Sequence, residues 1–229
     1  MPEVTYNIKW DEAAKKTYET GVDRGVLYTY NSAATEGTPY DAGYAWNGLT
    51  AFNKSPSGAE PTALWANNVK WMTLMSAEEF GATIEAYVYP DEFAACLGYA
   101  EDEDVAGLSI GQQNRSVFGL CVRTLIGNEA KGNDYGYKLH LVYGCLASPT
   151  ETSYATVNDS PEVDPMSFEI TTTPVAVSGF KPTAYLCIDS TKADPAKLAA
   201  LEAILYGSGE TKAKLPMPDE IISTLKAAG

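Results

Sequence analysis

Eight short runs rich in β-branched and aromatic residues follow one another along this chain, separated by turn-forming segments. In the run 82–89, Ile84, Ala86 and Val88 alternate with Glu85 and Tyr87. Because successive side chains leave a strand on opposite faces, this alternation predicts a strand with one buried and one wet face. The eight predicted strands span residues 25–30, 44–52, 69–74, 82–89, 116–126, 137–146, 166–172 and 184–189.

The run 137–146 has the same two-sided pattern. Lys138 and His140 are predicted to lie on its wet face. The residues predicted to share its packed face are Tyr137, Leu139, Leu141, Tyr143 and Cys145. No interval between the runs carries the helical pattern of about 10–15 residues that parallel βαβ crossovers need, so the chain is predicted to be mainly β.

One clear helix is predicted late in the chain. Asp194 can cap it, Pro195 suits its first position, Leu198 begins an apolar face, and Gly207 ends it. Shorter helices are predicted at 92–97, with Asp91 as the cap, and at 219–227. The last of these is too short to be stable alone, since isolated helices become marginal only at about 12–15 residues.

These elements predict two packed antiparallel sheets, arranged as a sandwich or partly closed barrel, flanked by one α-helix and carrying long loops. Residues 1–206 form the predicted β domain, and residues 207–229 a linker and a C-terminal arm with a short helix. Ile221, Ile222 and Leu225 are the apolar residues through which the arm would reach a neighbouring subunit. Folding of this tail back on its own domain is the alternative. The long connections 31–44, 53–66 and 98–114 are expected to be interaction loops.

The charge balance argues against a nucleic-acid binder. The chain has 16 basic and 30 acidic residues, a net charge of −14, whereas such binders bring Lys and Arg to the phosphates. The same sign would suit a conduit past which DNA must slide, because each phosphate contact would add affinity. The start of the chain lacks the apolar core of a secretory signal, and no run approaches the ~18 apolar residues of a membrane helix. We therefore expect a soluble protein made in a cytoplasm.

No group of residues predicts catalysis, a cofactor or a metal site. His140 is the sole histidine and lies in an apolar strand, whereas hydrolytic catalysis presents its base in a cleft. Cys121, Cys145 and Cys187 sit beside apolar strand residues and are predicted to be buried, reduced thiols. The acidic run 101–104 lacks the turn glycine of a calcium loop. The protein is expected not to be an enzyme.

Long stretches of the chain resemble the major tail protein, or tail tube protein, of long-tailed, non-contractile phages and prophages of Gram-positive bacteria. The resemblance covers nearly the whole chain. The matching stretches are YETGVDRGVLY (18–28), WNGLTAF (46–52), SPSGAEPT (55–62), LMSAEEFGATIEAYVYPDEFAACLG (74–98), SIGQQNR (109–115), YGYKLHLVYGCLASPTETSYATVNDSPE (135–162), TTTPVAV (171–177) and CIDSTK (187–192).

This resemblance implies a structural virion protein that assembles in the host cytoplasm. Six copies would form a ring, and stacked rings would form the tube through which double-stranded DNA passes without specific binding. Its partners would be other copies of the chain, a tape measure protein inside the tube before ejection, and tail terminator and distal tail proteins at the ends.

The candidate lumen residues are Glu85, on the wet face of its strand, and Glu101, Asp102, Glu103 and Asp104. An outer-face position is equally compatible with the alternation at Glu85, because alternation distinguishes two faces without naming them. Two other functions stay open. One is the inner tube of a contractile tail or secretion apparatus. The other is a carbohydrate-binding β-sandwich, suggested by 15 Tyr and 4 Trp.

Overall fold

The computed structural model describes residues 16–34, 38–102, 104–154, 156, 163–209 and 211–226. It is mainly β, with 47% strand and 14% helix, which confirms the predicted class. The strands are β1 (Thr17–Thr29), β2 (Ala42–Trp46), β3 (Leu49–Lys54), β4 (Ser57–Gly58), β5 (Pro61–Ala66), β6 (Val69–Met75), β7 (Glu78–Glu79), β8 (Gly81–Ala86), β9 (Ala100–Glu101), β10 (Ser109–Ile110), β11 (Phe118–Asn128), β12 (Gly132–Ala147), β13 (Met166–Thr172) and β14 (Tyr185–Asp189). The helices are α1 (Ala94–Leu97), α2 (Pro195–Tyr206) and α3 (Pro218–Lys226), with a 3₁₀ turn, η2 (Asp91–Phe93), before α1.

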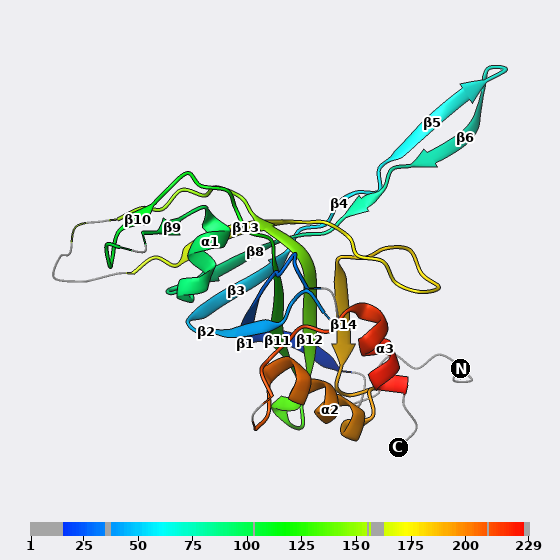
Figure 1. Cartoon of the computed structure of the whole chain (residues 1–229). Coiled ribbons are helices and arrows are strands. Elements are labelled where there is room, and N and C mark those ends of the chain that lie inside the picture. Colours follow the sequence, from blue (N-terminus) through cyan, green and yellow to red (C-terminus); the bar gives the residue numbers. More distant parts are fainter. Residues whose placement is uncertain are drawn as a thin grey trace.

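One antiparallel sheet of eight strands forms the body (Figure 1). Its order is β2-β1-β11-β12-β13-β8-β3, with β14 paired to a different part of β12. The end strands β2 and β3 are joined by the turn at Asn47 and Gly48, so the sheet curls back toward its beginning. A cleft of about 390 Å³ separates residues 19–22 of β1 from residues 50–54 of β3. Among the described residues the sheet therefore does not close into a barrel.

The long strand β12 bends the sheet at Gly144. Before the bend β12 pairs with β14, and after it with β13. Gly144 has a φ of +59°, and a Cβ there would lie 2.3 Å from the carbonyl oxygen of Thr173. The bend also shifts the side-chain alternation by one residue, so Leu141 and Cys145 belong to different cores. The prediction that Cys145 shares a face with Leu141 is therefore wrong.

The two faces of the sheet are both covered. The first core is enclosed where β3, β8 and β13 fold over β1, β11 and β12. It consists of Leu27, Trp46, Ile84, Ala86, Phe93, Cys96, Phe118, Leu120, Val122, Val142, Cys145, Ala147, Phe168 and Ile170. The second core lies against α2 and α3 on the opposite face, and it consists of Val26, Tyr28, Tyr40, Cys121, Leu139, Leu141, Tyr143, Ile188, Leu198, Leu201, Leu205, Leu215 and Ile221.

This double cover overturns the predicted wet face of β12. His140 is only 1% exposed, and its ring lies 5.8 Å from that of Phe52 on β3. Up to Tyr143 the alternation along β12 separated the two faces correctly. That the second face is also buried is decided by the strands that fold back over it.

The helices mostly follow their sequence signals. Asp194 caps α2 by accepting hydrogen bonds from the backbone amides of Ala196 and Lys197 at 2.9 and 3.2 Å, as predicted. The cap proposed for the earlier helix is wrong, because Asp91 begins the 3₁₀ turn and makes no side-chain cap bond. No helix within the described ranges is long and apolar enough to span a bilayer.

The C-terminal segment packs on its own domain. Leu215 is fully buried and its amide donates to the Tyr40 carbonyl at 3.0 Å, while the Tyr143 hydroxyl donates to the Pro216 carbonyl at 2.8 Å. Two helices, rather than the single one predicted, therefore flank the sheet. Of the predicted arm residues, Ile221 is buried in the second core, and Ile222 and Leu225 are half-buried. Residues 227–229 lie outside the described ranges.

The role of these three residues in contacts between rings stays a prediction, as does the domain boundary after residue 206. The packing does show that the segment 211–226 is part of the folded body. Removal of residues 208–229, which the sequence alone suggested would leave the β domain intact, would uncover Tyr40, Tyr143 and Leu205.

We predict that Leu215→Ala lowers the free energy of unfolding by about 2–5 kcal/mol, because it leaves a cavity in the second core. Urea denaturation of the monomer measures the change. Lys212→Ala, an exposed position three residues earlier, serves as the control and should stay within about 0.5 kcal/mol. Equal stability of the two variants would show that this segment does not dock on its own domain.

Candidate functional site

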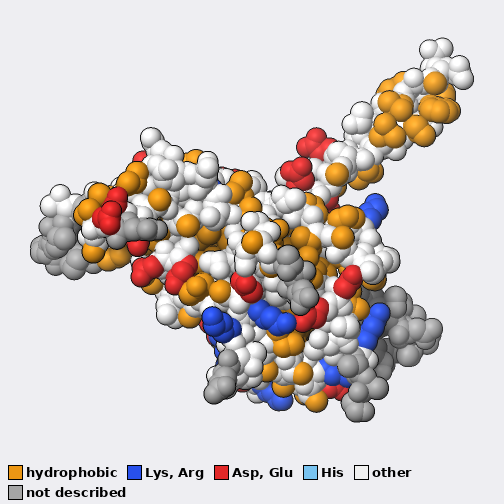
Figure 2. Space-filling view, in the orientation of Figure 1, with side chains coloured by type: hydrophobic (Ala, Val, Ile, Leu, Met, Phe, Trp, Pro, Cys, Tyr) orange, Lys and Arg blue, Asp and Glu red, His pale blue; other side chains and the backbone are white. Residues whose placement is uncertain are grey.

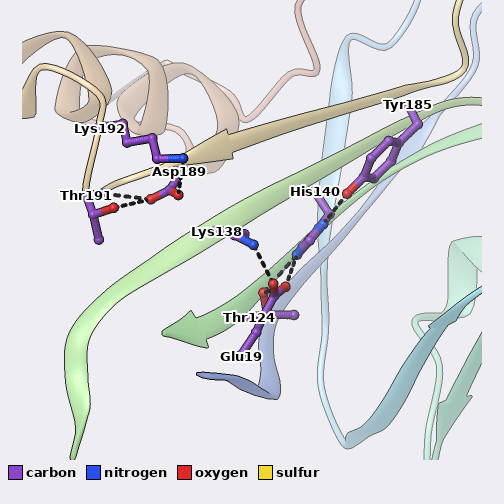
Figure 3. A network of polar contacts seen from close by, with 8 residues as sticks. All are labelled: Glu19, Thr124, Lys138, His140, Tyr185, Asp189, Thr191 and Lys192. Atoms are coloured by element: carbon purple, nitrogen blue, oxygen red, sulfur yellow. Dashed lines mark hydrogen bonds and ion pairs between the residues drawn. The ribbon is translucent and has the colours of Figure 1, made fainter. Parts of the chain in front are cut away.

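A polar network, buried at His140 and exposed at Glu19, links four strands (Figure 3). His140 Nδ1 lies 2.7 Å from the Tyr185 hydroxyl and Nε2 lies 2.8 Å from Thr124 Oγ1. Thr124 donates in turn to Glu19 at 2.7 Å, and Glu19 is also paired with Lys138. The network ties β1, β11, β12 and β14 together.

The direction of these bonds follows from the hydroxyl of Thr124. Because that hydroxyl gives its hydrogen to Glu19, its lone pair accepts from Nε2–H of His140. Nδ1 then accepts from the Tyr185 hydroxyl. The ring is therefore neutral, with its proton on Nε2, and each polar atom of the chain from Tyr185 to Glu19 has a partner.

Burial and hydrogen bonding set the pKa values of His140 and Glu19 in this network. Burial, helped by the positive charge of Lys54, lowers the pKa of His140 from 6.5 to about 4. Partial burial would raise the pKa of Glu19, but hydrogen bonds from Lys138 and Thr124 outweigh it and leave that pKa lowered. A neutral imidazole pinned by hydrogen bonds on both nitrogens stabilises the strands, and it has no free lone pair with which to accept a substrate proton.

A cleft of about 470 Å³ opens beside Glu19, and the charged side chains that line this cleft pair with one another. Asp189 accepts from the amide and hydroxyl of Thr191 at 2.9 and 2.6 Å and lies 3.7 Å from Lys192. The hydrogen bonds from Thr191 lower the pKa of Asp189 although burial acts to raise it. Glu19 is likewise matched by Lys138. Among the described residues no cluster of three or more His, Cys, Asp or Glu side chains could hold a metal ion.

The cysteines divide into two kinds. Cys96, Cys121 and Cys145 are buried and free, and burial raises the pKa of the Cys96 and Cys121 thiols to about 12, which makes them inert. Cys187 is exposed, so its predicted burial is wrong. On β14 the neighbouring Ile188 points into the second core, and alternation turns Cys187 outward.

Glu85 lies on a polar face of the sheet. It is half-buried on β8, where it pairs with Ser167 of β13 and accepts a long hydrogen bond of 3.5 Å from Asn53 of β3. Thr83 and Glu169, two residues away on their strands, pair on the same face. These five side chains form a surface with two carboxylates and no basic group.

The second acidic candidate lies elsewhere. Glu101 belongs to the short β9–β10 pair, which Figure 1 places beside α1 at one end of the molecule. Asp102 accepts from the backbone amides of Asp104 and Val105, both at 3.0 Å, and so closes a turn. Glu103 lies outside the described residues. The structure places this loop and Glu85 on different elements.

A two-stranded hairpin of β5 and β6 projects from the body (Figure 1). Its strands pair from Pro61 with Met75 to Ala66 with Val69. The turn is Asn67-Asn68, with φ values of +52° and +61°, the geometry of a tight two-residue hairpin turn. No other strand of the described chain pairs with β5 or β6.

Figure 2 shows hydrophobic side chains along the visible side of the hairpin, and the pairing of its strands places apolar side chains on both faces. Thr62 pairs with Leu74 and Leu64 pairs with Met72, so these four side chains share one face. The other side carries Trp65 and Trp71, which are 70% and 64% exposed. Lys70 is the one charged residue between 61 and 75. Such a continuous apolar surface marks an interaction site.

Only the second strand of this hairpin was predicted from the sequence. The run 69–74 was predicted to be a strand, whereas 53–66 was assigned to an interaction loop because Ser55, Pro56, Gly58 and Pro61 all favour turns. The signal that was available is the Asn67-Asn68 pair between two apolar runs, which is a strong indication of a two-residue hairpin turn.

No protein-family model matches this chain, and no curated protein matches it.

We predict that His140 makes the protein less stable in acid. The ring is neutral when folded with a pKa of about 4, against 6.5 ordinarily, so the unfolded chain takes up the proton first. Stability should be unaffected by His140 above pH 6.5 and fall as the pH drops toward 4.

Denaturation of the wild type and of His140→Gln between pH 8 and pH 4 tests this prediction. The stability difference between the two proteins should shrink by about 2–3 kcal/mol toward low pH, because Gln cannot be protonated. A difference that stays constant with pH would contradict the assignment of a buried neutral ring.

Proposed function

We propose that this protein is a tail tube subunit: copies associate into rings, of the six-fold kind implied by the resemblance, and the stacked rings enclose a channel for double-stranded DNA. The single observation that carries the proposal is the projecting β5–β6 hairpin, which is apolar on both faces and is left uncovered by the part of the chain that the structure describes. The resemblance along the sequence supplies the particular kind of assembly.

The hairpin needs a partner on physical grounds. An isolated two-stranded hairpin is marginally stable in water, and an exposed apolar strand edge invites pairing with another chain. The hairpin has two apolar faces, so a single flat contact would leave one of them wet. Insertion between neighbouring subunits covers both. We therefore assign the reaching element to the hairpin rather than to the C-terminal segment, which is packed on its own domain.

The sheet supports the rest of the proposal. Its curl, with β3, β8 and β13 over β1, β11 and β12, is compatible with the two packed layers or partly closed barrel expected of a tail tube protein. The polar face around Glu85 and Glu169 is our candidate for the channel wall, with the 101–104 loop as a second candidate. Carboxylates without basic groups would repel DNA phosphates and keep the DNA from binding.

The remaining parts of the proposal rest on the resemblance alone. They are the virion tail location, a tape measure protein within the tube before ejection, and tail terminator and distal tail proteins at its two ends. The inner tube of a contractile tail or secretion apparatus remains a second candidate, and a sheath gene beside this one would favour it.

Carbohydrate binding is the candidate from another class, since Trp65 and Trp71 could stack on sugar rings. The second face of the hairpin argues against it, because Leu64, Met72 and Leu74 are aliphatic and a sugar would leave them uncovered. Specific signals from a monomer on a glycan array would favour this alternative.

We predict that the purified protein forms rings or tubes as its concentration rises, and that Trp65→Thr/Trp71→Thr stays monomeric at the concentrations at which the wild type assembles. Threonine keeps the strand propensity of the hairpin while removing both indoles. Sedimentation velocity and negative-stain electron microscopy measure assembly. Tyr154→Ala, an exposed aromatic residue outside the hairpin, is the matched control and should assemble normally. Normal tubes from the double variant would contradict a role for the hairpin.

We predict separately that virions carrying Glu85→Lys eject DNA several-fold more slowly at low salt, because a lysine in each subunit would bind phosphates. Added salt should restore the rate by screening. Glu151→Lys, the same charge change at an exposed loop position, should leave ejection unchanged. Wild-type ejection by the Glu85→Lys virions would place Glu85 outside the channel.

A further inference from the structure

A preformed apolar groove lies near the root of the hairpin. One part is a cavity of about 590 Å³ lined by Val177, Phe180, Lys181, Pro182, Thr183, Tyr185, Leu186 and Ile222. A second cavity, of about 620 Å³, shares the residues Lys181, Pro182, Thr183 and Tyr185 with the first and continues to Met75 and Phe80 at the foot of β6. We call the two together the root groove.

The groove is held in shape by its own hydrogen bonds. Val175 and Thr183 exchange backbone bonds of 3.0 and 2.9 Å, which close the loop between them. Ser178 donates its amide and hydroxyl to Asp219 at 2.9 and 2.6 Å, which fixes the loop to the start of α3. Binding in such a site would cost little ordering of the loop.

The rim of the groove presents an aromatic anchor to solvent. Phe180 is 74% exposed, although it lies next to an apolar cavity that its own chain leaves open. Below it Tyr185 stacks on Phe80 with ring centroids 4.6 Å apart. Exposed aromatics beside an apolar pocket are the residues that dominate binding energy at protein interfaces.

We infer that the root groove receives the tip of the β5–β6 hairpin from a second copy of this chain. This inference rests on the proposed function and specifies which surface the hairpin meets. The hairpin projects away from the body, so its tip does not reach the groove at its own root (Figure 1). Trp65 and Trp71 supply the large apolar side chains that an open apolar groove can bury.

Charge favours the same pairing. Two copies, each with a net charge of −14, repel one another unless they meet through surfaces without carboxylates. Residues 61–75 of the hairpin and 174–186 of the groove loop contain no Asp or Glu, and each carries one lysine. Glu78, in the second cavity, is the one carboxylate among the residues that line the groove. Contact between them avoids placing acidic residues of the two loops against each other.

The contact gives the assembly a direction. Tip and groove are different surfaces of one molecule, so their contact is head-to-tail and leaves a free tip at one end and a free groove at the other. Such a contact either closes into a ring or continues into an open stack, according to the rotation between successive copies, and between stacked rings it would continue from layer to layer. An assembly built in this way is polar, with unlike ends.

Two complementary variants test the inference. Trp65→Thr/Trp71→Thr removes the tip and keeps the groove, and Phe180→Glu damages the groove and keeps the tip. We expect each alone to need at least a tenfold higher concentration than the wild type to assemble. Mixed in equal amounts, the intact tips of one should enter the intact grooves of the other and give particles limited to two layers.

Val163→Glu is the matched control for the added charge, since Val163 is exposed and outside the groove; it should assemble like the wild type. Wild-type assembly by Phe180→Glu would overturn the groove assignment alone, as would a mixture of the two variants that stays unassociated. A wild-type protein that remains monomeric at every concentration would overturn the proposed function together with the groove.

Discussion

The fold depends on one backbone constraint, the bend of β12 at Gly144. Its φ of +59° and the 2.3 Å that would separate a Cβ from the Thr173 carbonyl oxygen leave room only for glycine. The bend lets one strand pair with β14 before it and with β13 after it. It also sends Leu141 to the helix-covered core and Cys145 to the core under the returning strands. Without this bend the alternation of β12 would continue unchanged, and Cys145 would lie on the same face as Leu141.

Because both faces are covered by the chain itself, the body does not need a partner to bury its core. The C-terminal segment completes the second core through Leu215 and Ile221, and the network around His140 satisfies the polar groups between β1, β11, β12 and β14. The hairpin differs from the body, because none of its apolar residues belongs to either core. Folding and association are therefore carried by separate residues, and changes at Trp65 or Phe180 should alter association without unfolding the body.

Seven of the eight predicted strand runs each coincide with one strand of the structure, and the cap of α2 was also predicted, because alternation, turn residues and an N-cap aspartate act over a few positions. The run 44–52 was predicted as one strand, but it contains the end of β2, the turn at Asn47 and Gly48, and the start of β3. Burial depends on distant parts of the chain and was predicted less well. His140 was assigned to a wet face because nothing near it reveals that β3 returns over that face. Cys187 was assigned to the core because its neighbours are apolar. The acidic candidates came from the alternation at Glu85 and from the acidic run 101–104, and their role stays a prediction. The hairpin, on which the functional proposal rests, was half missed because its first strand follows a run of turn-forming residues.

Hydrogen–deuterium exchange of the wild-type protein at a series of concentrations tests the central claim most directly. We predict that the amides of residues 61–75 exchange rapidly at low concentration, since β5 and β6 each have one unpaired edge. These amides should become protected as the protein associates. Residues 177–186 should gain protection over the same concentration range, while the amides of β11 and β12 stay protected throughout. Association that leaves the hairpin amides unprotected would show that copies of this chain meet through another surface.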